Sequence, residues 1–365
     1  MNVLSLFDGI SCGRVALERA GIKVDKYYAS EIDKYAISIT QHNYPDTIQL
    51  GDVNKWREWD IDWSSIDLLI GGSPCQGFSL AGKQLNFNDP RSKLFFVYVD
   101  ILNYIKSINP NVKFLLENVK MKKEFESVIS NTLKTQPIEI NSALVSAQNR
   151  KRLYWTNWEF DTPEDKHIML KDIVHEYSKV DRDKALCIDA NYYKGGNLKQ
   201  YYEKHRRQLV FEWLNEYVIP FDKTLQILDK EVERGKVDYF GKDSQANRVY
   251  YIHDKAVTLC GSAGGGAAKM GQYLFGCLTP DRVNQRQNGQ RFNDGNKFYT
   301  LTAQDKHGVL IEGYIRKLTP IECERLQTLP DNYTKCEGVS NTQRYKCLGN
   351  GWTVDVIAHI FRNIE

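Results

Sequence analysis

The sequence lacks the long apolar runs of a membrane protein. Its apolar runs, such as those within "IDLLIGG" and "VKFLLENV", are far shorter than the roughly 18 residues that a membrane span requires. The first residues, "MNVLSLFDG", contain neither the basic region nor the cleavage site of a secretory signal. These absences argue against a membrane or secreted protein, and we expect an intracellular, cytoplasmic one.

Paired cysteines and metal-binding clusters are also missing. The chain has 8 cysteines and 7 histidines, yet it has no CxxC pair and no histidine cluster at ligand spacing. We therefore expect reduced thiols and no bound metal.

A strong charge of one sign is absent as well. The formal net charge is +3 over 365 residues, which is too small to indicate a partner. Lys and Arg nevertheless outnumber Asp and Glu between residues 184 and 297, in a segment with many Gly and aromatic residues. Such a segment suits nucleic acid, and a solvated basic surface explains it equally well.

The first 157 residues alternate between strand-like and helix-like patterns. Helical spacing is clear from Leu94 to Ile108. The alternation predicts an α/β fold with a doubly wound Rossmann-like sheet, whose ligands lie beyond the carboxyl ends of the strands. The candidate strands are residues 3–7, 26–31, 47–52, 67–72, 112–119, 141–146 and 152–157.

This alternation is lost between about residues 160 and 315. One helical stretch is predicted at 205–218, "HRRQLVFEWLNEYV". Three similar segments begin at residues 184, 255 and 297, and they predict short strands with exposed loops in a smaller β-rich domain. Chance similarity within a β-rich segment explains them about as well.

Helical signals return near the C-terminus. Thr319 can cap a helix, Pro320 suits its first position and Glu322 completes a capping box. A last helix is expected in "TVDVIAHIFRNI". Two helices this short are not stable alone, so we expect them to pack on the first domain. The predicted domains are residues 1–157, 158–313 and 314–365.

Acidic residues follow the first strands at regular intervals. "FDGISCG" (7–13) has glycines that permit close approach of a ligand, although Ser11 replaces one glycine of the dinucleotide fingerprint. Glu31 ends the second candidate strand, where it suits ribose hydroxyls, and Asp52 ends the third, where it suits an adenine amino group. Each acid alone is more often a cap or a surface charge. Their order favours an adenosine-containing cofactor.

Cys75 lies in "GGSPCQGFS", directly after the fourth candidate strand, and Glu117 lies at the end of the fifth. Both side chains would project toward one pocket. A free thiol is only a few per cent thiolate at neutral pH, but the thiolate is a strong nucleophile. Pro74 fixes the backbone before Cys75. A single cysteine is usually a buried structural residue, and the neighbouring acid favours a nucleophile instead.

In combination, these motifs resemble those of the cytosine-5 DNA methyltransferases. The resemblance covers about residues 1–157 and 314–365, and "GNGW" with "FDGIS" is similar to the vertebrate de novo branch, whereas the middle region is not. The motifs are, in chain order, "FDGISCG", "SEID", "GDV", "GGSPCQGFS", "RSKLF", "LLENV", "QNRKRLYW", "RKLTPIECERLQTLPDNY" and "LGNGWTVDVIAHIF".

The resemblance implies a role for each residue of the predicted pocket. Cys75 would attack carbon 6 of cytosine, and Glu117 would bind ring nitrogen 3 and the exocyclic amine. Arg152 would contact cytosine oxygen 2, and Arg150 would support Cys75 or a phosphate. The target base must leave the duplex, and the loop 76–91 is then expected to close over the site.

The resemblance also implies S-adenosyl-L-methionine as cofactor, double-stranded DNA as substrate and a target recognition domain in the middle region. A stand-alone prokaryotic or phage-encoded monomer, with or without a cognate restriction endonuclease, is expected. An RNA methyltransferase of the same superfamily and a non-catalytic DNA-binding relative are the alternatives. Cofactor-binding candidates are Phe7, Asp8, Gly9, Glu31, Asp52, Val53, Pro74, Leu94, Asn350 and Trp352. DNA-binding candidates are Gln76, Ser79, Arg248, Arg282, Arg286 and Arg291.

Overall fold

The computed structural model describes residues 1–73, 93–176, 178–195, 201, 204–213, 237–238, 248–249, 272–273 and 313–364. The chain divides into two compact units. Unit 1 comprises Met1–Ile173, Arg182–Tyr193 and Thr319–Glu365, and unit 2 comprises Val174–Asp181 and Lys194–Leu318. Residues 158–173 and 182–193, expected in the middle domain, thus group with unit 1. In the described part, no helix is long and apolar enough to cross a membrane.

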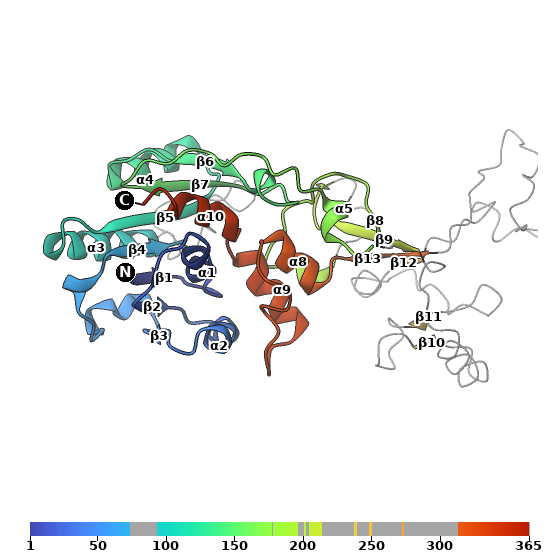
Figure 1. The fold of residues 1–365 in the computed structure, drawn as a ribbon, viewed down its shortest axis with the longest axis horizontal. Coiled ribbons are helices and arrows are strands. Elements are labelled where there is room, and N and C mark those ends of the chain that lie inside the picture. The colour runs from blue at the N-terminus through green and yellow to red at the C-terminus, as the bar shows by residue number, and fades with distance from the viewer. Residues whose placement is uncertain are drawn as a thin grey trace, which may run out of the picture. The chain divides into compact units, whose positions relative to one another are not determined.

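Unit 1 is built on a seven-stranded sheet with the order β3-β2-β1-β4-β5-β7-β6 (Figure 1). The first five strands of this order run parallel, whereas β7 runs antiparallel to both β5 and β6. The predicted α/β Rossmann-like class is confirmed. The strands are β1 (Asn2–Leu6), β2 (Lys26–Ser30), β3 (Ile48–Gln49), β4 (Leu68–Gly71), β5 (Lys113–Val119), β6 (Ile138–Asn141) and β7 (Lys151–Thr156).

Helices cover both faces of this sheet because alternate strand residues point to opposite sides. Leu69 of β4 belongs to the core cluster that also contains Phe95 and Ile105 of α3 (Lys93–Ile108) and Ile129 of α4 (Lys123–Leu133). Ile70, the next residue, approaches α1 (Cys12–Arg19) instead, with its Cδ1 2.5 Å from an ideal Cβ built on Gly13. The apolar run of β4 is therefore the signature of a strand buried on both faces.

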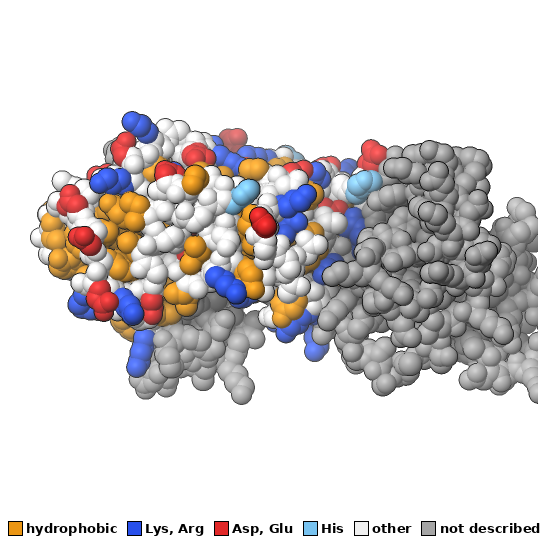
Figure 2. All heavy atoms as spheres, turned by 90° about the horizontal axis from the view of Figure 1, so that it is seen from below, with side chains coloured by type: hydrophobic (Ala, Val, Ile, Leu, Met, Phe, Trp, Pro, Cys, Tyr) orange, Lys and Arg blue, Asp and Glu red, His pale blue; other side chains and the backbone are white. Residues whose placement is uncertain are grey.

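Aromatic rings extend the core cluster to the surface. Trp56, in η1 (Val53–Glu58), packs edge-to-face on Trp63 of η2 (Trp63–Ser65), with centroids 5.7 Å apart. Tyr104 of α3 contacts both indoles. Together they line a surface hollow, and Arg57 lies over the Trp56 ring at 4.2 Å. Figure 2 shows apolar side chains gathered toward one end of the described surface.

The C-terminal helices belong to unit 1, as α8 (Pro320–Leu326), α9 (Asn341–Asn350) and α10 (Val354–Phe361). The predicted capping box is confirmed: Thr319 Oγ1 accepts from the Glu322 N–H at 3.2 Å, and the Thr319 N–H donates to Glu322 at 2.7 Å. Helix α10 packs on α1, where Arg19 pairs with Asp355 at 2.6 Å. The first and last helices of the chain thus lie side by side.

Three local predictions were wrong. The strand expected at 141–146 ends at Asn141, and Ser142–Leu144 forms a 3-10 turn, η3, that Asn141 caps through the Ala143 N–H. The helix expected at 205–218 contains a strand, β9 (Leu209–Trp213). The segment at 184 forms no strand, only one β-bridge between Ala185 and Gln148. The similar segments at 255 and 297 lie outside the described residues.

Unit 2 contains an antiparallel four-stranded sheet with the order β12-β13-β9-β8. The pattern "QLVFEW" fits helical and strand periods, and pairing of β9 with β13 over five residues decides in favour of the strand. A second pair, β10 with β11, is also antiparallel. The strands are β8 (Ser178–Lys179), β9, β10 (Val237–Asp238), β11 (Arg248–Val249), β12 (Gln272–Tyr273) and β13 (Gly313–Lys317). Two further short helical segments of the described part are α5 (Leu170–Ile173), which lies in unit 1, and η4 (Tyr192–Lys194), which begins there.

Candidate active site

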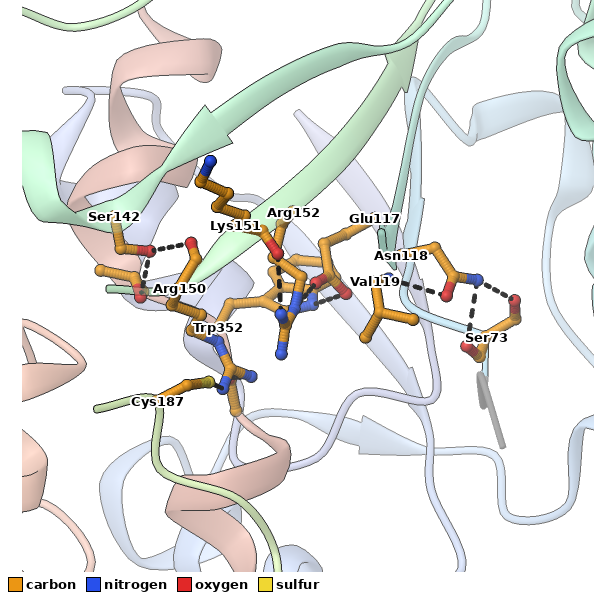
Figure 3. Close-up of polar contacts among 12 residues, drawn as sticks. Ser73, Glu117, Asn118, Val119, Ser142, Arg150, Lys151, Arg152, Cys187 and Trp352 are labelled. Carbon is orange, nitrogen blue, oxygen red and sulfur yellow. Dashed lines mark hydrogen bonds and ion pairs between the residues drawn. The ribbon is translucent and has the colours of Figure 1, made fainter. Parts of the chain in front are cut away.

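A buried carboxylate lies near the carboxyl end of β5. Glu117 is 8% exposed and comes from a central strand between β4 and β7. Its Oε1 accepts from Arg152 Nε at 2.9 Å, and its Oε2 accepts from the indole N–H of Trp352 at 3.1 Å (Figure 3). Two donors from distant parts of the chain thus fix both carboxylate oxygens, and a charge buried in this way is held in one orientation.

The antiparallel register of β5 and β7 brings Arg152 to this carboxylate. Glu117 pairs with Tyr154, and Arg152 is two residues away on the same strand face, at the diagonal distance that a long side chain can span. Burial, and then the negative charge of Glu117, raise the pKa of Tyr154 above its ordinary value. Tyr154 therefore stays a neutral phenol beneath the ion pair.

Gly72 provides the space that this arrangement needs. A Cβ built on Gly72 would lie 3.0 Å from both Glu117 Oε2 and Trp352 Nε1. A larger residue would crowd the hydrogen bond between them. Gly72 directly follows β4, so the end of the fourth strand and the carboxylate of the fifth are neighbours, and the approach of Cys75 to Glu117 stays a prediction.

Arg150 is buried within unit 1, with 4% of its surface exposed. Its Nη1 donates to the Ile188 carbonyl at 3.1 Å and contacts Cys187 Sγ at 3.4 Å (Figure 3). Its Nη2 donates to the carbonyls of Gly351 at 2.9 Å and Gly349 at 3.3 Å. These contacts join β7 to the turn after α9, and support of Cys75 or of a phosphate by Arg150 stays a prediction.

The predicted nucleophile lies outside the described residues, together with its loop. The last described residue before it, Ser73, accepts from Asn118 Nδ2 through its hydroxyl at 3.2 Å and its carbonyl at 3.5 Å. Asn118 is also buried and adjoins Glu117. The chain therefore leaves the described part beside the carboxylate. The predicted site residues beyond it are Pro74, Cys75, Gln76, Ser79, Arg282, Arg286 and Arg291, and of Arg248 only the strand position is described.

A tight turn after β1 occupies the position predicted for a cofactor. Phe7, Gly9 and Ser11 all have positive φ, at 58°, 62° and 56°. Glycine adopts this conformation without cost, whereas the two side-chain residues hold it against a steric penalty. The Gly9 N–H donates to Glu31 Oε2 at 2.8 Å, so the turn and the end of β2 are linked.

Glu31 and Asp8 have different environments. Glu31 Oε1 accepts from the N–H groups of Ile32 and Asp33 at 2.7 and 2.8 Å, while its side chain remains partly exposed. Asp8 is also only partly exposed, and burial raises the pKa of its carboxyl although hydrogen bonds from Ser11 and Tyr27 oppose that rise. The Asp8 side chain therefore holds the turn to β2 through side-chain hydroxyls, whereas Glu31 binds backbone N–H groups.

The other cofactor candidates are spread around the same edge of the sheet. Asp52 caps η1 by accepting from the Asn54 N–H at 2.9 Å, and Val53 is buried in the core cluster. Leu94 packs against that cluster from the first turn of α3. Asn350 is exposed at the end of α9, two residues before Trp352. The contacts of these residues with a cofactor stay predictions.

A family model named C-5 cytosine-specific DNA methylase matches residues 1–365. The chain belongs to this family. The predicted resemblance is confirmed, as is the enzyme class, DNA cytosine-5 methyltransferase. The family match therefore also covers residues 158–313, the central segment in which we found no family motif.

Named relatives of this methylase support the same assignment. The chain is 30% identical to orphan methyltransferase M.SPRI of Bacillus phage SPR, with 100% of this chain and 97% of the relative covered. It is 28% identical to type II methyltransferase M.HhaI of Haemophilus parahaemolyticus, with 100% and 94% covered. The type II name refers to restriction–modification, and a restriction partner of this methylase stays a prediction.

Solved structures share the fold. The Entamoeba histolytica methyltransferase EhMeth matches with a TM-score of 0.57 and 18% identity, covering 99% of this chain and 96% of that one. A mutant of Spodoptera frugiperda DNMT2 matches with a TM-score of 0.52 and 17% identity, covering 99% and 98%. At these identities the likeness concerns the fold alone.

Proposed function

We propose that this methylase transfers a methyl group from S-adenosyl-L-methionine to carbon 5 of a cytosine flipped out of duplex DNA, through a covalent adduct of Cys75. The observation that carries the proposal is the Glu117 carboxylate of β5, which Arg152 and Trp352 hold next to Gly72, where the chain leaves β4 toward Cys75. Buried carboxylates fixed beside a loop cysteine suit chemistry in which charge develops on a bound ring.

The turn at Gly9 fits an adenosine-containing cofactor. A Cβ built on Gly9 would meet no atom within 4 Å, so the space on the open side of the turn is free among the described residues. Glu31 is fixed by three backbone N–H groups and is still partly exposed, which suits hydrogen bonds from two ribose hydroxyls. When bound, S-adenosyl-L-methionine would supply an electrophilic methyl group, and its sulfur would keep the electron pair of the broken bond and leave as a neutral thioether.

Each protein group then has one task. The Cys75 thiolate adds to carbon 6, and the electron pair of the 5,6 double bond becomes available at carbon 5 for methylation. Glu117 accepts a hydrogen bond from the exocyclic amine, a proton held between Glu117 and ring nitrogen 3 balances the charge that thiolate addition places on the ring, and Arg152 neutralises charge at oxygen 2. Loss of the proton from carbon 5 restores the double bond and releases the thiolate.

Other cysteines of the described part are poor candidates for this step. Burial raises the pKa of Cys12 to about 12 and that of Cys347 to about 12, so both stay protonated at neutral pH. Cys187 is exposed, and its sulfur is occupied by Arg150. These environments favour Cys75 as the nucleophile.

Replacing Cys75 by alanine tests the proposal. We expect Cys75→Ala to lose methyl transfer to duplex DNA while it binds the duplex as the parent does, because alanine cannot form the bond to carbon 6. Cys336→Ala is the matched control and should keep activity, because Cys336 is a partly exposed cysteine with no hydrogen bond to Glu117 or Arg150 in the described part of the chain. Bisulfite sequencing of DNA from cells that express the chain would report the modified base and its flanking sequence. Retained transfer in Cys75→Ala would refute the covalent mechanism.

A further inference from the structure

A buried glutamine holds the residues on both sides of Trp352. Gln327, which follows α8, is 0% exposed. Its Nε2 donates to the Gly351 carbonyl at 3.2 Å, directly before Trp352, and its Oε1 accepts from Thr353 Oγ1 at 2.9 Å, directly after it. Nε2 also donates to the Leu348 carbonyl at 2.7 Å. One side-chain amide therefore brackets the tryptophan.

Buried partners fix Gln327 in turn. Gln148 Nε2 lies 3.4 Å from Gln327 Oε1, and Thr353 Oγ1 also meets the Ser142 hydroxyl at 2.9 Å. Arg150 Nη2 donates to the same Gly351 carbonyl at 2.9 Å. A buried polar network whose members are hydrogen-bonded is rigid, because every alternative orientation leaves a polar group unpaired.

The direction of the Trp352 indole depends on this network. Trp352 is only partly buried, and its ring lies near Gly13 and Gly72, so small glycines rather than large side chains border it there. The backbone at Gly351 and Thr353 therefore sets where the indole N–H points, and it points to Glu117 Oε2 at 3.1 Å.

We propose that Gln327 is a positioning residue of this methylase, which acts through Trp352 on Glu117. The inference rests on the proposed function, since it takes Glu117 as the group that meets cytosine. Gln327 touches neither the carboxylate nor any proposed ligand site. Its effect on catalysis comes from the orientation of one N–H donor.

A double-mutant cycle tests this path. Gln327→Met keeps the length of the side chain and removes its donors and acceptor. We expect it to lower kcat about fivefold, the rate equivalent of one hydrogen bond of ordinary strength, while KM for DNA changes less than twofold. In a Trp352→Phe background, which lacks the indole N–H, the same substitution should lower kcat less than twofold. If Gln327→Met instead lowered kcat by the same factor with and without the indole N–H, the two residues would act independently and the proposal would be overturned.

Fluorine spectra of protein labelled with 5-fluorotryptophan give a readout that does not depend on turnover. The chain has 7 tryptophans, and the Trp352→Phe variant identifies the signal of Trp352. We expect Gln327→Met to shift or broaden that signal. Arg150→Lys, which loses the guanidinium N–H that donates to the Gly351 carbonyl, should act on the same signal and serves as the second variant if Gln327→Met does not fold.

Ser130→Ala is the matched control. Ser130 Oγ accepts from the Trp155 indole N–H at 3.0 Å, so this buried bond has the same chemistry in another place. The control should move the Trp155 signal, leave that of Trp352 in place and keep kcat. If the parent transfers no methyl group, the proposed function fails and the spectra still decide on positioning. An unmoved Trp352 signal in both Gln327→Met and Arg150→Lys would refute the positioning role.

Discussion

Glu117→Gln removes the charge of the central carboxylate and keeps its size, so it tests the effect of the charge alone. The amide has the same size and can still accept from the Trp352 indole, but it cannot neutralise Arg152. The two ion-pair side chains are only 11% and 14% exposed, so a guanidinium that loses this carboxylate remains largely out of contact with water. Removing one partner of a fully buried pair costs about 3–5 kcal/mol, and partial exposure reduces this to about 1–3 kcal/mol.

The expected loss of rate is larger than the loss of stability suggests. Electrostatic donors or acceptors aimed at a developing charge contribute about 3–4 kcal/mol each, so we expect the rate of methyl transfer to fall at least about 100-fold. Transfer of a radioactive methyl group to duplex DNA measures the rate, and urea denaturation measures the free energy of unfolding at the same temperature.

Glu139→Gln is the matched control for this substitution. Glu139 lies on β6, which β7 separates from β5, and it pairs with Lys120 at 2.8 Å, and its side chain is 33% exposed. The same chemical change there should alter the rate less than twofold. If Glu117→Gln kept a rate within about fivefold of the parent, Glu117 would not stabilise the developing charge.

Two further substitutions test the packing and the pH dependence. Gly349→Ala would place a Cβ 2.2 Å from the carbonyl carbon of Asp189. Because a backbone atom cannot rotate away as a side chain can, we expect the free energy of unfolding in denaturant to fall by about 1–3 kcal/mol. An unchanged midpoint of unfolding would contradict this packing. Arg325 holds both oxygens of Asp331, at 2.9 and 2.7 Å, and lowers the pKa of that carboxyl below its ordinary 3.8. Asp331→Asn should therefore be less stable than the parent at neutral pH, by a small amount because the pair is exposed, and the difference should disappear as the pH falls below 3.8 through the lowered pKa. A difference that grew on acidification would refute this linkage.

The alternation of strands and helices in unit 1 could be predicted because buried parallel strands and amphipathic helices leave different periods in the sequence. The capping box at Thr319 was predictable for a similar reason, since all its contacts lie within four residues. Segment 205–218 was mispredicted because "LVFEW" satisfies both periods, and its pairing with β13, about 100 residues later, decides between them. Local sequence does not contain that partner.

In the candidate site, too, local sequence patterns could be predicted and long-range contacts could not. Glu117 and Arg152 could be selected from motif order, and their approach follows from the register of β5 and β7. The hydrogen bond from Trp352 to Glu117 joins residues 235 positions apart, and no local pattern predicts it. Gln327 was missed altogether, because in sequence it reads as one polar residue after a helix, and its role follows only from its burial and its hydrogen bonds on both sides of Trp352.

The separation of Glu117 and Trp352 along the chain also sets the delay between their synthesis on the ribosome. Ribosomes add about 5–20 residues per second, so the 235 residues that separate the two take roughly 12 to 47 seconds to synthesise. During that interval β5 can already pair with β4 and β7, whereas the carboxylate still lacks the indole donor and α1 still lacks α10. A growing chain therefore completes the contacts of Glu117 only after its last helices are made.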